Sequence, residues 1–263
     1  MIEVNSVSFR YHKDWVLQDV SFQVNQGDFI GVIGPNGSGK TTLLKILCRY
    51  LSPQKGDVLI DRVSVKRMNR VDIAKKIGMV AQETHFLFPF TGQEVVLMGR
   101  TPYLGHRLFE SEKDLEIARK AMQWTETLSF SERPIDELSG GERKRLFIAR
   151  TLAQEPEVVL LDEPTANLDL HHQIDFLDLM LTLNRERGLT MLMASHDMNI
   201  ASEFCDRLLL FQEGKIHKEG SPEEVITQEN IQHVYGCDVW VDQHPISGTP
   251  RVNLLKKNPH EKE

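Results

Sequence analysis

The chain lacks any apolar run long enough to cross a bilayer. Apolar stretches such as Val158 to Leu161 and Leu189 to Ala194 are far shorter than the ~20 residues that a membrane-spanning helix needs. The N-terminal residues Met1 to Val4 are not a basic region followed by an apolar core, so we expect no secretory signal. We therefore expect no segment to span a membrane, and we expect the protein to stay in the compartment where it is made.

Cysteine and positive charge are also scarce. The 263 residues include three cysteines, Cys48, Cys205 and Cys237, without CxxC pairing, which favours buried thiols in a reducing cytosol over a disulfide framework. The net charge of -7 argues against nucleic acid as a partner, because a phosphate backbone needs a concentrated basic face. A local basic patch could still oppose that charge. The hydrophobic content of 40% is that of a globular protein with a sizeable core.

Two hydrophobic patterns predict strands. Apolar and polar residues alternate from Ile2 to Val24, before a turn signal at Asn25-Gln26-Gly27, which predicts a small antiparallel sheet. Continuous apolar runs at Phe29–Ile33, Val158–Leu161 and Met191–Ala194 are typical of strands buried on both faces of a mostly parallel sheet. Because helical patterns lie between these runs, the sequence predicts an α/β fold.

The helical patterns divide the chain. Apolar residues recur at helical spacing in Lys40 to Leu51 and in Ser111 to Leu128. Residues 91–154 have an almost purely helical pattern, which predicts a helical subdomain inserted into a main domain of residues 1–220. Residues 221–263 form an expected C-terminal appendage, with a helix over 222–235, a short strand over 238–241 and a polar, frayed end over 256–263.

The segment GPNGSGKTT follows a predicted strand and opens a predicted helix, the context that a GxxxxGK[ST] phosphate loop requires. Its glycines let backbone N–H groups face phosphate oxygens at the positive end of the helix. Lys40 supplies a charge between the β- and γ-phosphates, and the Thr41 hydroxyl is a ligand for Mg²⁺. An ordinary glycine-rich turn would not need Lys40-Thr41 in register. The candidate nucleotide-binding residues are Gly34, Pro35, Asn36, Gly37, Ser38, Gly39, Lys40, Thr41 and Thr42.

An acidic pair, Asp162-Glu163, comes directly after the apolar run at Val158–Leu161. Both acids should therefore lie at the carboxyl end of a strand, where open α/β sheets bind ligands. We expect Asp162 to hold Mg²⁺, usually through water, and Glu163 to polarise the attacking water. A pair of solvated loop charges is the alternative, which the phosphate loop makes the minor one.

The stretch LSGGERKRLFIAR, which begins at Leu138, resembles the signature motif of ATP-binding cassette proteins. Ser139-Gly140-Gly141 leads into a predicted helix whose N-terminus suits an anion. Ser139 with Glu142 is also a capping box, which needs no ligand, and both interpretations can hold. The resemblance covers essentially the whole chain. It implies an ATP-hydrolysing enzyme of the P-loop ABC type, whose signature motif closes over the nucleotide held by the other subunit.

The same resemblance assigns further residues. Tyr11 resembles the aromatic that stacks on adenine, with packing between strands as its alternative. Gln82 resembles the glutamine that contacts the metal and the attacking water, although a surface glutamine would look the same. His196 resembles the histidine that contacts the γ-phosphate. Asp169 belongs to the segment Asn167-Leu168-Asp169, which resembles the loop that crosses the dimer interface.

Two positions depart from the commoner pattern, Ala166 for serine and Glu142 for glutamine. The cofactors that the resemblance implies are ATP and Mg²⁺.

The chain contains only one set of motifs, so a single chain cannot supply two sites that each combine a phosphate loop with the signature motif of another copy. We therefore expect an ATP-dependent homodimer. The chain has neither the long coiled coils of DNA-repair relatives nor the two cassettes of translation factors, and exporters usually carry a fused membrane domain. We therefore expect an importer subunit that binds separate permease subunits at the cytoplasmic face of the membrane and acts indirectly with a substrate-binding protein.

The stretches EVVLMGRTPYLG from Glu94 and YGCDVWVDQHPISGTPRV from Tyr235 resemble the subfamily that imports ferric siderophores, haem and cobalamin. Other transported substrates, or a soluble non-transport ATPase, are the alternatives. An aromatic-rich segment after Gln82 completes the candidates. It predicts a permease contact, with a buried aromatic core as the alternative, and comprises Phe86, Leu87, Phe88 and Phe90.

Overall fold

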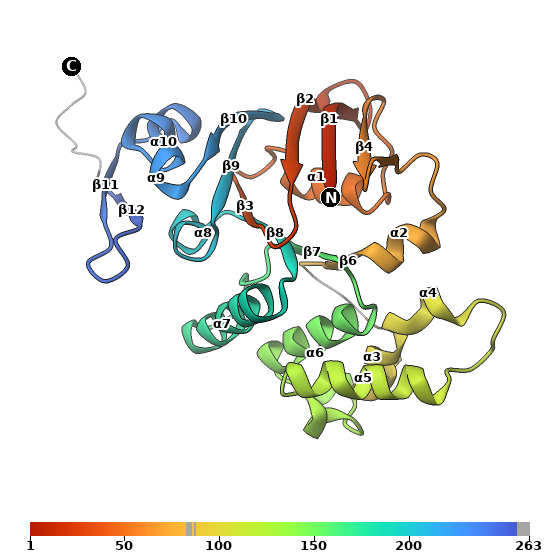
Figure 1. Ribbon diagram of the computed structural model, residues 1–263. Coiled ribbons are helices and arrows are strands. Elements are labelled where there is room, and N and C mark those ends of the chain that lie inside the picture. The colour runs from red at the N-terminus through yellow and green to blue at the C-terminus, as the bar shows by residue number, and fades with distance from the viewer. Residues whose placement is uncertain (83–85, 87, 257–263) are drawn as a thin grey trace, which may run out of the picture.

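A six-stranded sheet forms the centre of the computed structural model, which describes residues 1–82, 86 and 88–256. Five neighbouring strands run parallel, and the sixth forms an antiparallel hairpin at one edge (Figure 1). In sheet order they are β10 (Lys215–Gly220), β9 (Arg207–Gln212), β3 (Phe29–Ile33), β8 (Thr190–Ser195), β7 (Val158–Asp162) and β6 (Ile77–Val80).

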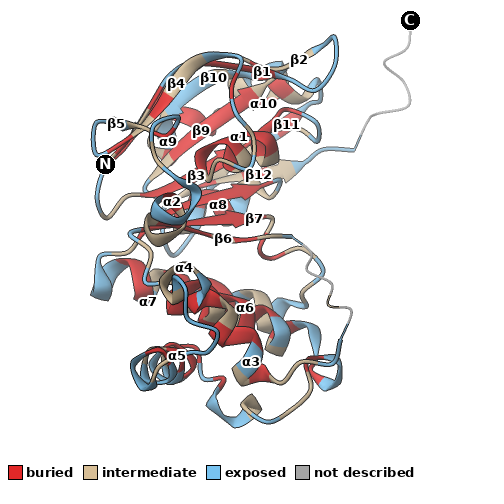
Figure 2. Cartoon of the chain, turned by 90° about the vertical axis from the view of Figure 1, so that its right-hand side faces the viewer, coloured by how far each residue is buried: buried red, intermediate tan, exposed pale blue. Residues whose placement is uncertain are grey.

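Both faces of this sheet are buried, as the continuous apolar runs predict. Alternate residues of β3 join two different hydrophobic clusters: Phe29 and Ile33 belong to one, and Ile30 and Val32 belong to the other. All five residues of β3 are fully buried. The strands coloured as buried in Figure 2 lie between layers of other elements, so the α/β fold class is confirmed.

A second, antiparallel sheet covers one of these faces. It contains, in order, β2 (Trp15–Val24), β1 (Ile2–Arg10), β4 (Lys55–Ile60) and β5 (Val63–Ser64). In the register of β1 and β2, Ile2 lies opposite Val24, and Val4 lies opposite Phe22, so the predicted alternation places apolar side chains on one face. The predicted sheet is confirmed, and β4 and β5 extend it.

Residues 92–153 form a helical lobe, which lies below the sheets in Figure 1. An apolar stripe of Leu146, Ala149 and Ala153 is buried. The lobe contains α3 (Gly92–Leu97), η1 (Met98–Arg100), α4 (Thr101–Leu104), α5 (Glu112–Trp124), η2 (Leu128–Phe130), η3 (Ile135–Glu137) and α6 (Gly140–Ala153).

A buried ion pair ties this lobe together. Nε of Arg100 donates to Oδ1 of Asp114 at 3.0 Å, and both side chains are 3% exposed. Another guanidinium nitrogen of Arg100 donates to the Ala153 carbonyl and to the Glu155 carboxylate. The Arg100 guanidinium also lies 3.9 Å from the centre of the Tyr103 ring. This one side chain therefore joins the start of the lobe to α5 and to the end of α6.

The C-terminal elements pack onto the main hydrophobic core. Their buried residues Val225, Ile231, Val239 and Val252 belong to the same cluster as Phe29 of the central strand. These elements are α9 (Pro222–Val225), α10 (Gln228–Tyr235), β11 (Val239–Gln243) and β12 (Pro250–Leu254).

The remaining helices are α1 (Lys40–Leu47), α2 (Arg70–Lys76), α7 (Leu170–Arg187) and α8 (Met198–Phe204). No helix in the described part of the chain is long and apolar enough to cross a membrane.

Three predicted helix boundaries were wrong. The first helix ends at Leu47 instead of Leu51, since Arg49 has a φ of 56° in the left-handed region. The second helix, predicted over Ser111 to Leu128, is α5, which Ser111 caps and which ends at Trp124.

Within α5 the apolar residue Leu115 is exposed, and Leu128, the predicted end, lies beyond the helix. The predicted helix over 222–235 is two helices, because Thr227 caps a new one. Residues 257–263 of the expected frayed end lie outside the described residues.

Candidate active site

Four adjacent parallel strands bring the candidate residues to one edge of the central sheet. β3 leads into the glycine-rich loop, and β8 ends just before His196. The strand β7 ends at Asp162, directly before Glu163, and β6 ends two residues before Gln82. Because the carboxyl ends of parallel strands meet at the same edge, segments far apart in the sequence form one site.

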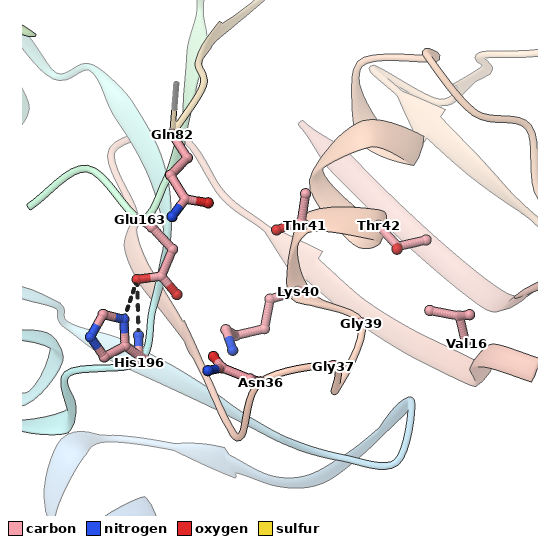
Figure 3. A pocket seen from close by; sticks show the side chains of 10 residues that line it. All are labelled: Val16, Asn36, Gly37, Gly39, Lys40, Thr41, Thr42, Gln82, Glu163 and His196. Atoms are coloured by element: carbon pink, nitrogen blue, oxygen red, sulfur yellow. Dashed lines mark hydrogen bonds and ion pairs between the residues drawn. The ribbon is translucent and has the colours of Figure 1, made fainter. Parts of the chain in front are cut away.

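These segments line a cleft of about 350 Å³. Figure 3 shows Lys40 and Asn36 facing Glu163 and His196 across it. The lining residues are Val16, Asn36, Gly37, Gly39, Lys40, Thr41, Thr42, Gln82, Glu163 and His196. Sequence reasoning missed Val16, which comes from β2 and gives no signal in its own segment.

The glycine-rich loop needs glycine where it turns into α1. Gly39 has a φ of 103°, which residues with a side chain rarely adopt. A Cβ at Gly39 would lie 2.8 Å from the Val16 carbonyl oxygen. Gly34 has a φ of 148°, and a Cβ there would overlap the Phe211 carbonyl. The loop can therefore approach β2 and β9 only without side chains at these two positions.

Lys40 lies at the floor of the cleft. Its ammonium group donates to the carbonyls of Gly34 at 2.7 Å and Pro35 at 3.1 Å. Burial lowers the pKa of Lys40, and the nearby carboxylates of Glu163 and Asp162 oppose that effect. These carboxylates favour a charged Lys40 beside the loop.

The loop also contains a buried hydroxyl that is free to bind a ligand. Oγ of Ser38 is buried and has no hydrogen-bond partner among the described residues. A buried polar atom without a partner is costly, and a phosphate oxygen would satisfy it. With the backbone N–H groups at the start of α1, the loop residues fit a nucleotide phosphate.

Thr41 and Asp162 form a pair of oxygen ligands. The Thr41 hydroxyl donates to Oδ1 of Asp162 at 2.9 Å. Burial raises the pKa of Asp162, while the hydrogen bond from Thr41 lowers it. Mg²⁺ binds through one or two protein oxygens together with phosphates and water, so this pair fits Mg²⁺ bound beside a nucleotide.

Glu163 and His196 contact each other because their strands are neighbours. Nδ1 of His196 lies 2.6 Å from Oε2 of Glu163, and the His196 backbone N–H donates to the same oxygen at 3.3 Å (Figure 3). Glu163 has a φ of 47°, and its N–H donates to the Ala194 carbonyl at 3.0 Å. A strained backbone of this kind often occurs at functional sites. The imidazole holds the carboxylate at the cleft wall, where it can accept a proton from water.

Tyr11 lies beside the cleft and does not line it. The residue is 52% exposed, and its ring meets Phe9 edge-on, with ring centres 4.9 Å apart. Its hydroxyl lies 3.4 Å from Oγ1 of Thr42. The ring therefore remains accessible for stacking, next to the helix that follows the phosphate loop.

The signature segment does not line the cleft of its own chain. Ser139 caps α6 in a capping box: Oγ of Ser139 accepts from the Glu142 N–H at 3.3 Å, and Glu142 accepts from the Ser139 N–H at 2.7 Å. The capping interpretation is confirmed. Asp169 is likewise absent from the cleft and caps α7.

The aromatic segment after Gln82 is mixed. Phe86 and Phe90 are half-buried and pack against the main core, whereas Phe88 is 65% exposed. Leu87 lies outside the described residues. The buried-core alternative therefore holds for Phe86 and Phe90, and the permease contact stays a prediction for Phe88.

A phosphate loop between a buried strand and a helix, beside a strand that ends in Asp162 and is followed by Glu163, defines a nucleotide-hydrolysing protein of the P-loop class. The profile of the ABC transporter family matches residues 17–166, and the chain belongs to this family. It is an ATP-binding cassette ATPase.

Three known proteins illustrate the relationship. The ferric enterobactin transport ATP-binding protein FepC of Escherichia coli is 39% identical over 92% of this chain and 89% of its own. A transporter in an inward-facing conformation, described as of the metal-chelate type, superposes with a TM-score of 0.86 at 28% identity over 97% of both chains. The dimeric cassette MJ0796 superposes with a TM-score of 0.72 at 29% identity, over 84% of this chain and 98% of its own.

Proposed function

We propose that the chain is the ATP-hydrolysing subunit of an importer for a metal chelate, such as a ferric siderophore, haem or cobalamin. The observation that carries the proposal is the 39% identity to FepC over almost the whole chain. The structural similarity to a metal-chelate transporter over 97% of both chains supports it, C-terminal elements included. The chain would act at the cytoplasmic face of the membrane with separate permease subunits and, indirectly, a substrate-binding protein.

We further propose that two copies share each active site. Ser139-Gly140-Gly141 and Asp169 are absent from the cleft of their own chain, so they are available to a partner's nucleotide. The similarity to a dimeric cassette supports this arrangement. Each residue occurs twice in a two-fold dimer, so two copies of the single set of motifs can complete two sites.

The residues of the shared site divide among phosphate binding, base stacking, metal binding and activation of water. Lys40, Ser38 and the loop N–H groups bind phosphate oxygens, and Tyr11 stacks on the base. Thr41 and Asp162 would hold Mg²⁺, which supplies charge neutralisation when bound. Glu163 accepts a proton from the attacking water, which Gln82 helps to orient. His196 holds Glu163 and contacts the γ-phosphate. Phosphoryl transfer depends mainly on such positioning and charge stabilisation.

For its organisation, we propose an ATPase domain of residues 1–220 with a helical subdomain over about 91–154, and an appendage of residues 221–263. The shared hydrophobic cluster supports an appendage that is packed onto the domain and not tethered to it.

Transport by reconstituted vesicles tests the function. The chain would be combined with the co-encoded permease and binding protein, and ATP-driven uptake of ferric enterobactin, haem and cyanocobalamin would be measured against histidine and maltose. We expect uptake of one metal chelate, and its loss with Lys40→Ala. Uptake of none of the chelates by a complex that hydrolyses ATP would overturn the substrate class. A chain that binds no permease would favour a non-transport ATPase.

A further inference from the structure

The N-terminal turn of α7 contacts the N-terminal turn of α6. Gly141 is buried in the first turn of α6, and a Cβ built on it would overlap the ring of His172 in α7. The imidazole therefore lies directly against the backbone of the signature segment. A residue larger than glycine at position 141 would displace either that ring or the segment.

His172 also holds the end of the segment Asn167-Leu168-Asp169. Its Nδ1–H donates to the Asp169 carboxylate, with distances of 2.8 and 2.9 Å to the two oxygens. Its backbone N–H donates to Oδ1 of Asp169 at 3.0 Å. These hydrogen bonds from the backbone and side chain of His172 lower the pKa of Asp169. One imidazole thus contacts both segments that lie outside the cleft of their own chain.

A second link fixes the same two helices one turn further along. Arg145 of α6 donates to Asp175 of α7 at 2.9 Å and to Glu126 at 2.7 Å. The pair formed by Gly141 and His172, with the pair formed by Arg145 and Asp175, spans the first turns of both helices. The signature segment and the segment 167–169 are therefore held in one relative position.

We propose that His172 is a positioning residue that couples the signature segment to Asn167-Leu168-Asp169, so that the two reach the partner subunit together. The inference rests on the proposed shared site. The imidazole does not line the cleft of its own chain, so its loss changes closure between subunits and leaves the phosphate loop intact. A shift of about 1 Å in a positioning group can cost 10²-fold in rate.

Three substitutions separate the two contacts of His172. His172→Phe keeps a ring against Gly141 and removes the donor to Asp169. His172→Asn keeps a donor near the position of Nδ1 and removes the rest of the ring. His172→Ala removes both. His171→Ala is the matched control, because His171 is adjacent to His172 and its side chain is 82% exposed.

The readouts are the kcat and KM for ATP and, in a Glu163→Gln background, the fraction of closed dimer with trapped ATP. For His172→Ala we expect kcat to fall about tenfold or more, with KM and single-chain ATP affinity within about twofold. We expect intermediate losses for His172→Phe and His172→Asn. If His172 only held Asp169 as the cap of α7, loss of its side chain would lower thermal stability and leave the trapped fraction unchanged.

The outcomes distinguish this inference from the proposed function. If the Glu163→Gln protein with an intact His172 traps ATP as a closed dimer, and His172→Ala traps it equally well while folded, the coupling role is rejected. If the Glu163→Gln protein with His172 intact never forms a closed dimer, the shared site itself fails. A drop confined to His172 variants, with His171→Ala unchanged, supports the coupling.

Discussion

Glu163 accepts a hydrogen bond from the imidazole of His196 at 2.6 Å, across the ends of two neighbouring parallel strands. The carboxylate side chain is 13% exposed and the imidazole 62% exposed. The more protected member of the pair is therefore the carboxylate. This arrangement suits a base that must keep one orientation toward a bound water.

The first prediction concerns that base. Glu163→Gln keeps the shape of the side chain and removes its capacity to accept a proton. We expect normal ATP binding, a fall in kcat of at least about 10²-fold and accumulation of closed dimer, measured by nucleotide binding, phosphate release and size-exclusion chromatography. Near-normal turnover would reject Glu163 as the base.

The second prediction tests the shared site with two different lesions. Lys40→Ala removes the phosphate charge, and Ser139→Arg blocks closure, so each homodimer should fail. In a heterodimer of the two, one composite site receives both lesions and the other receives none. With Glu163→Gln in both chains, we expect one trapped ATP for each heterodimer.

Ser139→Ala is the control for the helix-capping role of Ser139. Loss of the helix cap alone should cost only about 1 kcal/mol of stability. If Ser139 acted only within its own chain, mixing would restore nothing. Heterodimers confirmed to contain both chains that trapped no ATP would contradict the shared site.

The third prediction concerns the surface of this chain that we expect to contact the permease. Phe88 is 65% exposed, whereas Phe86 and Phe90 pack against the core. In a Cys237→Ser background, we expect Phe88→Cys to react with a maleimide and to cross-link to a cytoplasmic loop of the permease. The control is Phe109→Cys, at a position 79% exposed, which should be labelled without cross-linking. Equal cross-linking of both positions would argue against a specific contact at Phe88.

The fourth prediction follows from the Arg100–Asp114 pair. Burial opposes ionisation of Asp114, but hydrogen bonds from Ser111 and the Arg100 guanidinium outweigh it, so its pKa lies well below that of an ordinary aspartate. A depressed carboxyl pKa stabilises the fold above the unfolded-state pKa, and that contribution is lost as pH falls through the folded-state value. We expect Asp114→Asn to lose about 3 to 5 kcal/mol at neutral pH.

Urea denaturation at a series of pH values checks the direction of this pH dependence of stability. The free energies of unfolding of the original protein and of Asp114→Asn should converge from about pH 5 downward, because the stabilising charge disappears from the original protein alone. Glu116→Gln on the same helix is the control, since Glu116 is exposed. Parallel curves for the original protein and Asp114→Asn would contradict a stabilising ionised Asp114.

Much of the central sheet could be predicted because burial on both faces leaves a continuous apolar run. The run at Phe29–Ile33 coincides with β3, and the run at Val158–Leu161 is extended by only Asp162 in β7. The adjacency of Glu163 and His196 depends on the order of the strands in the sheet, which no local pattern predicts. Short strands such as β4, with the sequence KGDVLI, have too weak an alternation to be recognised.

The missed contacts depend on long-range packing. Val16 reaches the cleft because β2 lies against the glycine-rich loop, and no local pattern records that approach. The ring of His172 lies against Gly141, from another helix, for the same reason. The early end of the first helix depends on a left-handed residue, Arg49, whose type does not favour that conformation.

The full burial of β3 has a kinetic consequence. Amide protons of strands protected on both faces exchange with solvent only in the rarest openings of a protein. The backbone amides of β3, which leads into the phosphate loop, should therefore be among the slowest to exchange with deuterium, with or without ATP. Changes in exchange during the catalytic cycle should instead concentrate in the helical lobe and at the first turns of α6 and α7.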